Sequence, residues 1–198
     1  MHRISLENPY GDDKVYDACG GFGMKDTSGE RFSGRDVVTG LANMTDRGNG
    51  LGSGYAIYGC YPEYADCYAF HVMYTDPDSR PQVEARLGAD FVMVHAEEVP
   101  HNPTPALHDA PLIWRYFLRT EDDHPQVVLM GEQEYVVARV MAINTAGLGA
   151  YIYSSGKDLG AFKGVGFPQQ IADYFGVQHY EGTLWTAHNR FPTNTPGW

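Results

Sequence analysis

The amino-acid sequence predicts an α+β protein, and three observations support that class. The chain has 198 residues, which is the size of one domain or of one domain with an insert. Hydrophobic residues make up 43% of it, close to the norm for a globular protein. Short strand-like runs alternate with segments of helical periodicity, and the middle of the chain has the order β-α-β-β-α-β. That order predicts a ferredoxin-like unit.

Charge and cysteine content narrow the classes of function. A formal net charge of −11, with few clusters of basic residues, argues against a nucleic-acid partner. The sequence contains no long uncharged apolar run and its start lacks an apolar signal core, so we expect no membrane partner and a cytoplasmic location. Cys19, Cys60 and Cys67 show neither CxxC spacing nor nearby paired histidines. The sequence therefore predicts no metal site and no disulfide framework.

The N-terminal region begins with a polar segment, residues 1–18, which we interpret as a leader or propeptide before a fold that starts near Cys19. Ser33 is the expected N-cap of a helix that ends near residues 47–50. Its apolar side chains share one face that we expect to lie against a sheet. They are Val37, Val38, Leu41 and Met44.

Glycines repeat between Gly48 and Gly54, just before a predicted strand at residues 55–58. The segment matches neither the Walker pattern nor GxGxxG, so a tight turn is favoured over a phosphate-binding loop.

Residues 66–158 are predicted to form the ferredoxin-like insert. Its expected elements are a strand at 68–74, a helix from Asp78 or Ser79 to Leu87, and strands at 91–95 and 112–118, followed by a helix at 132–144 and a strand at 150–153. The second helix is expected to bury Val136, Val137, Val140 and Met141. An insert that packs or docks is favoured over a small-molecule regulatory site, because such units often carry no chemistry.

The C-terminal region is predicted to contain a helix at 168–175, with Pro168 in its first turn, and then a strand at 180–188. This strand delivers Asn189 and Arg190 to its end. We therefore expect functional side chains to gather at strand ends.

Two residue types suggest the hydrolysis of an amide. Cys19 could act as a nucleophile. The alternative is a cysteine buried in the core. Arg190 could hold an α-carboxylate through two parallel hydrogen bonds, with Thr193 and Asn194 as neutral partners. The alternatives are a surface salt bridge and an ordinary turn.

Four segments carry a resemblance to a known family. They are Asp17-Ala18-Cys19-Gly20, the segment from Met44 to Gly50, the segment from Tyr153 to Gly166, and His188-Asn189-Arg190-Phe191-Pro192-Thr193-Asn194-Thr195. Together they resemble class II glutamine amidotransferase domains, most of all the amidotransferase subunit of archaeal-type glutamate synthase. The resemblance extends over most of residues 17–198.

The resemblance implies a layered α/β/β/α domain of the Ntn-hydrolase type, incomplete at its C-terminus. Residues 19–65 and 159–198 would form the N-terminal part of that domain, around the insert. Cys19 would be the nucleophile and Arg190 the clamp for the α-carboxylate of glutamine. The remaining implied site residues line the glutamine pocket or support the nucleophile: Phe191, Thr193 and Asn194 in the first group, and Gly20, Arg47 and Gly48 in the second.

The implied reaction is hydrolysis of L-glutamine through a cysteinyl thioester to glutamate and ammonia, for glutamate biosynthesis. The ammonia would be used by the catalytic subunit of glutamate synthase, which carries FMN and an iron–sulfur cluster. This chain would hold no cofactor itself.

Two departures from the family pattern qualify this expectation. Cys19 follows 18 residues, which a propeptide cleavage would remove, and the sequence ends before the His-Asn-Gly segment that supplies oxyanion donors in the family. Losing one such donor costs about a hundredfold or more in rate. We therefore expect the chain alone to be poorly active unless a second chain completes the site. Two alternatives remain: a non-catalytic docking or regulatory subunit, and an Ntn amidase for another amide.

Overall fold

A computed structural model describes residues 19–107 and 109–190, and its first sheet has four strands. They are β1 (Gly20–Lys25), β3 (Ser53–Tyr58), β8 (Leu159–Gly164) and β10 (Leu184–Asn189). The order across the sheet is β1-β10-β3-β8, and every pair is antiparallel. A two-residue ladder joins β2 (Phe32–Ser33) to β9 (Glu181–Gly182). The strand predicted at 180–188 is thus two strands, separated at Thr183.

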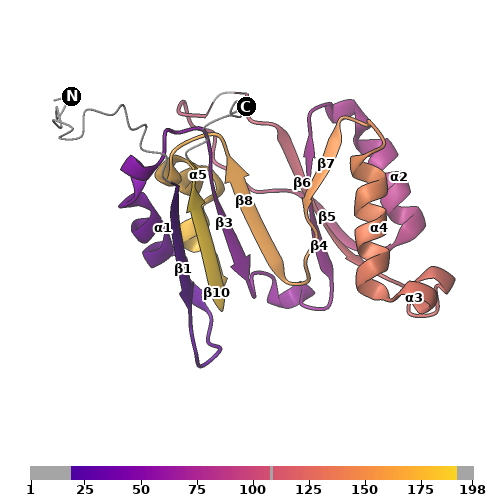
Figure 1. The fold of residues 1–198 in the computed structure, drawn as a ribbon. Coiled ribbons are helices and arrows are strands. Elements are labelled where there is room, and N and C mark those ends of the chain that lie inside the picture. Colours follow the sequence, from indigo (N-terminus) through magenta and orange to yellow (C-terminus); the bar gives the residue numbers. More distant parts are fainter. Residues whose placement is uncertain (1–18, 108, 191–198) are drawn as a thin grey trace, which may run out of the picture.

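Two helices, α1 (Arg35–Ala42) and α5 (Pro168–Phe175), cover one face of the first sheet (Figure 1). Val37, Val38 and Leu41 are buried there, as the predicted apolar stripe required, whereas Met44 lies beyond the helix. Ser33 is not the N-cap, because it belongs to β2 and Gly34 occupies the cap position. A Cβ on Gly34 would lie 2.7 Å from Cζ3 of Trp185, so the helix start approaches the core too closely for a side chain.

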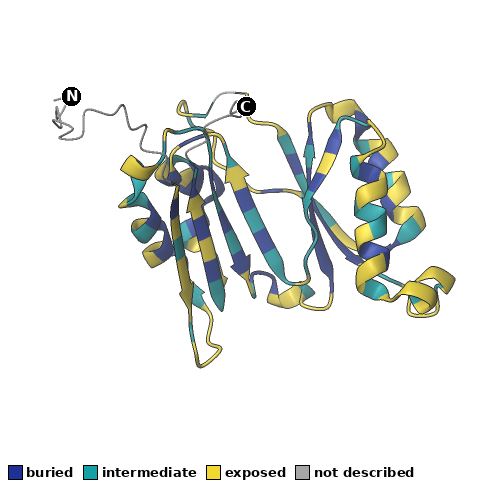
Figure 2. Cartoon of the chain, in the orientation of Figure 1, coloured by how far each residue is buried: buried dark blue, intermediate teal, exposed yellow. Residues whose placement is uncertain are grey.

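The opposite face of the first sheet is more exposed along β10. Trp185, Ala187 and Asn189 are buried on the helix side, while Thr186 and His188 alternate with them and are exposed (Figure 2). Successive side chains of a strand point to opposite faces. The side chains of β10 therefore point alternately into the core and toward solvent.

The second sheet is formed by β4 (Tyr68–Tyr74), β5 (Val92–Glu98), β6 (Leu112–Arg119) and β7 (Ala150–Ser154). Its order is β5-β6-β4-β7, again antiparallel throughout. Helices α2 (Arg80–Asp90) and α4 (Glu132–Asn144) lie on its outer side (Figure 1). The elements follow the predicted β-α-β-β-α-β order. The prediction missed α3 (Pro125–Met130), a short helix just before α4.

The buried face of α4 differs from the prediction. Tyr135, Val136 and Ile143 are buried, but Val137 and Met141 are each 55% exposed. Apolar residues occur on several sides of this helix, so periodicity alone did not indicate which side meets the sheet. The contacts with β7 select the side of Val136 and Ile143.

Short 3-10 helices complete the described structure: η1 (Thr45–Arg47), η2 (Pro62–Tyr64), η3 (Pro77–Ser79) and η4 (Val177–His179). The two sheets meet where β4 and β7 contact β8. Over residues 19–107 and 109–190, none of the helices combines the length and the apolar character needed to cross a membrane.

Candidate functional site

Cys19 and Arg190 lie at the same end of the ladder between β1 and β10. Gly20 pairs with Asn189 in the antiparallel register, so Cys19 and Arg190 each stand one residue beyond that pair. Cys19 is exposed, and Arg190 is partly exposed. The alternative of Cys19 as a buried core cysteine is therefore wrong. A thiol and a guanidinium that are 171 positions apart in the sequence are brought to one sheet edge.

The loop from Met44 to Gly52 lies against this edge. A Cβ on Gly20 would lie 3.0 Å from Cβ of Met44 and 3.5 Å from Cβ of Arg47, which places η1 directly over the start of β1. At the other end of the loop, the Arg190 amide N–H donates to the Gly52 carbonyl oxygen at 2.9 Å. The loop therefore contacts the residues on both sides of the candidate site.

Glycine is required in this loop for conformational reasons. Gly50 has φ of 78° and Gly52 has φ of 150°, a region that other residues rarely adopt. These values support the interpretation of the glycine repeat as a tight turn.

Gly48 and Asn189 fit together at the base of the loop. Asn189 is fully buried, and its Nδ2 donates to the carbonyl oxygens of Met44 at 2.9 Å and Thr45 at 3.3 Å. A Cβ on Gly48 would lie 2.5 Å from Cγ of Asn189, well inside van der Waals contact. Asn189 thus ties the loop to the end of β10, and the missing side chain at Gly48 makes room for it.

Sequence reasoning did not identify Asn189 as a site residue. A signal was present, because Trp185, Ala187 and Asn189 occupy alternate positions of one strand. An amide at the third inward position must find backbone partners when it is buried. That argument predicts a loop anchored at the end of the strand.

Five of the predicted site residues therefore share one region, which we call the Cys19 edge: Cys19, Gly20, Arg47, Gly48 and Arg190. Phe191, Thr193 and Asn194, together with the predicted leader at 1–18, lie outside the described residues. Among residues 19–107 and 109–190, no group of three or more His, Cys, Asp or Glu side chains is arranged to hold a metal ion.

The Cys19 edge places a nucleophilic side chain beside one that can bind a carboxylate. The thiol is reachable from solvent, and the guanidinium stands at the adjacent strand end. Gly21 is exposed, so the backbone next to the thiol can be approached closely. A nucleophile and a carboxylate-binding group on neighbouring strand ends can hold the two ends of a small substrate.

Comparisons with known proteins give similarity without a function. No model of a protein family matches the chain. A protein of Archaeoglobus fulgidus, described as an uncharacterized protein, is 52% identical over 189 residues, which is 94% of this chain and 50% of that protein. The chain thus spans about half the length of the curated relative it matches.

Proposed function

We propose that this chain is part of a class II glutamine amidotransferase of the glutamate synthase type. One observation carries the proposal: the ladder between β1 and β10 brings Cys19 next to Arg190, with the Arg47-Gly48 loop against both. These are the residues in which the sequence resembles that family. The segments that carry the resemblance are far apart in the sequence. Their meeting at one end of the first sheet is a geometric observation that supports the resemblance independently.

The proposed reaction is hydrolysis of the side-chain amide of L-glutamine. Arg190 holds the α-carboxylate of the substrate, and the Cys19 thiolate attacks the amide carbon. The new S–C bond forms, the C–N bond breaks, and ammonia leaves with the proton that the thiol gave up. Water then hydrolyses the thioester to glutamate and restores the thiol.

Removal of residues 1–18 is part of the proposal. It would free the α-amine of Cys19, which has a pKa of about 8 and can carry the proton from thiol to leaving group. Phe191, Thr193 and Asn194 would line the glutamine pocket.

The proposed architecture is an Ntn-hydrolase-type layered α/β/β/α domain with a ferredoxin-like insert. Its support is the origin of the strands, since all of the first sheet comes from residues 19–65 and 159–190 and all of the second from residues 66–158. The ammonia would pass to a cytoplasmic glutamate synthase partner that carries the FMN and the iron–sulfur cluster.

The test is covalent labelling by 6-diazo-5-oxo-norleucine, a glutamine analogue that alkylates nucleophilic cysteines. Intact mass and peptide mapping are recorded for the full chain together with the subunit or chain that completes the site. We expect loss of the leader and one adduct on Cys19, and we expect excess L-glutamine to prevent labelling. Cys19→Ala should abolish the adduct, whereas Cys67→Ala, a matched change at a buried cysteine, should keep it.

The outcomes separate the proposal from its two alternatives. An intact leader and no adduct in the completed assembly would favour the docking or regulatory subunit. An adduct on Cys19 that L-glutamine does not prevent would favour an amidase for another amide. Equal labelling of Cys19→Ala would reject Cys19 as the nucleophile.

A further inference from the structure

A second concave site lies between the turn that follows β3 and the strands β5 and β6. It is a pocket of about 380 Å³. Its principal lining side chains are Tyr61, Tyr64, His95, Glu97, Arg115 and Phe117. We call it the Arg115 pocket.

The Arg115 pocket is separate from the Cys19 edge. The first residue of β3, Ser53, pairs with Asn189, while the pocket begins at Cys60, just past the other end of that strand. Six residues of extended strand span about 20 Å. A ligand in the pocket would therefore not touch Cys19.

Arg115 lines the pocket as a buried cation that is only 7% exposed. Its Nε and Nη2 donate to Oε1 of Glu97 at 2.9 and 2.6 Å, and its Nη1 donates to the Tyr61 hydroxyl at 3.1 Å. These bonds use three of the five guanidinium N–H groups. Nη1 and Nη2 each carry a second N–H group, and Arg115 lines the pocket, so a bound molecule can accept from it.

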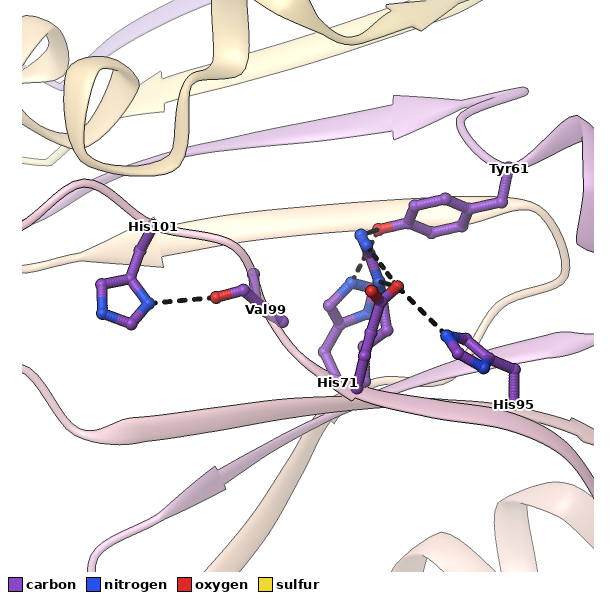
Figure 3. Close-up of polar contacts among 7 residues, drawn as sticks. Tyr61, His71, His95, Val99 and His101 are labelled. Carbon is purple, nitrogen blue, oxygen red and sulfur yellow. Dashed lines mark hydrogen bonds and ion pairs between the residues drawn. The ribbon is translucent and has the colours of Figure 1, made fainter.

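The network behind Arg115 is fixed by a buried histidine. The Tyr61 hydroxyl lies 3.0 Å from Nε2 of His71, and burial lowers the pKa of His71 to about 3, so this ring is neutral near pH 7. Because the Tyr61 oxygen accepts from Arg115, its own hydrogen is free to donate to His71. Figure 3 shows Tyr61, His71 and His95 converging on this network, whereas His101 lies apart and contacts the Val99 carbonyl oxygen.

Aromatic rings form the wall beside the ion pair. Tyr64 stacks on Phe117 with centroids 4.0 Å apart, and its ring lies 5° from parallel to that of His95 at 5.7 Å. His95 Nε2 is 3.8 Å from the Glu97 carboxylate. The pocket thus places a flat apolar surface next to a cation and a carboxylate.

We propose that the Arg115 pocket binds a free α-amino acid. A carboxylate alone would face Arg115 but also the carboxylates of Glu97 and Glu63, and an amine alone would face the Arg115 cation. A zwitterion presents the opposite charge to each, with its carboxylate toward Arg115 and its ammonium toward Glu97. Its side chain would lie on the aromatic wall. A volume of about 380 Å³ is at the small end of ligand pockets, which suits a molecule of this size.

The test is binding of the twenty amino acids to the full chain, by thermal shift at 10 mM and then by calorimetry for those that raise Tm. Each amino acid that binds is compared with its decarboxylated amine and its deaminated acid. We expect at least one amino acid to bind and both analogues to bind at least tenfold more weakly. No shift with any of the twenty, or equal binding of either analogue, would overturn the proposal.

Variants locate the binding site. Glu97→Gln should weaken binding at least tenfold, and Gly88→Ala, a change in α2 where a Cβ would meet nothing within 4 Å, should leave the Kd unchanged. If Glu97→Gln does not fold by circular dichroism, Tyr64→Ala at the pocket wall replaces it, with the same expected direction. Unchanged binding in Glu97→Gln, or in Tyr64→Ala where that variant replaces it, would reject the pocket. This outcome does not depend on the proposed amidotransferase function.

Discussion

The Cys19 edge and the Arg115 pocket differ in how the fold presents their polar groups. At the Cys19 edge the thiol is exposed, and the surrounding backbone is shaped by glycines and held by one buried amide, Asn189. In the Arg115 pocket the cation itself is buried and is held by Tyr61 and Glu97, side chains from two other segments. One site is an exposed thiol on a constrained backbone, and the other is a buried side-chain network.

This difference indicates where each site is sensitive to substitution. A site shaped by backbone conformation fails when a side chain is added, because close-packed atoms have nowhere to move. A site built from a buried polar network fails when a partner is removed, because the remaining groups stay desolvated. The predictions below test this contrast, from the largest expected effect to the smallest.

Gly48→Ala should have the largest effect. The added Cβ would overlap the Asn189 side chain, forcing it away from the Met44 and Thr45 carbonyl oxygens. Overpacking and the lost hydrogen bonds together should lower the free energy of unfolding by about 3 kcal/mol, measured in urea.

Gly88→Ala in α2 is the matched control for this substitution. A Cβ there would meet nothing within 4 Å, so we expect stabilisation of about 0.5–1 kcal/mol from the lower entropy of the unfolded chain. Equal effects of the two changes would mean that the fit of Gly48 to Asn189 does not hold the loop.

Arg115→Met should lower the free energy of unfolding by about 2 kcal/mol. Removing one partner of a buried ion pair costs about 3–5 kcal/mol, but Glu97 is about one-third exposed and water can replace part of the lost interaction. Urea unfolding measures the loss. A neutral or stabilising result would show that the aromatic rings, rather than the ion pair, hold this region together.

His71 should make stability depend on pH. Burial lowers its pKa in the folded chain to about 3, against about 6.5 when unfolded. Between these pH values the unfolded chain binds more protons than the folded chain. The contribution of His71 to the free energy of unfolding is therefore fully present above about pH 6.5 and falls on acidification by up to about 1.4 kcal/mol per pH unit.

His71→Gln isolates this contribution, because the amide oxygen can still accept from Tyr61 but does not titrate. The difference in unfolding free energy between the wild type and the variant should shrink as the pH falls from 7 to 5. Parallel curves over that range would contradict the assignment of a neutral buried imidazole.

His188→Gln should have the smallest effect. His188 is on the exposed face of β10, although it lies one residue from buried Asn189. We expect a change within about 0.5 kcal/mol in the free energy of unfolding, since surface substitutions without special contacts rarely do more. A loss of more than 1 kcal/mol would indicate that this face is covered in solution.

Element types were largely predictable, whereas boundaries and helix faces were not. The helix at 168–175 and the helix at 132–144 have the predicted bounds. The cap at Ser33 and the buried side of α4 were wrong, since both depend on what the helix meets in the folded chain. A local pattern contains no information about the Trp185 ring beneath Gly34 or about the position of β7 relative to α4.

The two sites differed in the same way. Cys19 and Arg190 stand in segments with a recognisable pattern, so the sequence indicated both. Arg115 carried only a weak signal: it shares an inward-facing register with Ile113 and Phe117, where a charge is unusual. Its partners Tyr61 and Glu97 come from other segments, and the sequence does not reveal that they meet.

The sequence by itself determined the α+β class and the order of the main elements of residues 66–158, and it indicated the residues of the Cys19 edge, because periodicity, turn residues and motif spacing are local properties. Only the tertiary structure decided the pairing of Gly20 with Asn189, the fit of Asn189 against Gly48, and the existence of the Arg115 pocket. Each of these depends on contacts between residues far apart in the chain. Such contacts are selected by packing and by the need to satisfy buried polar groups, which act on the folded chain as a whole.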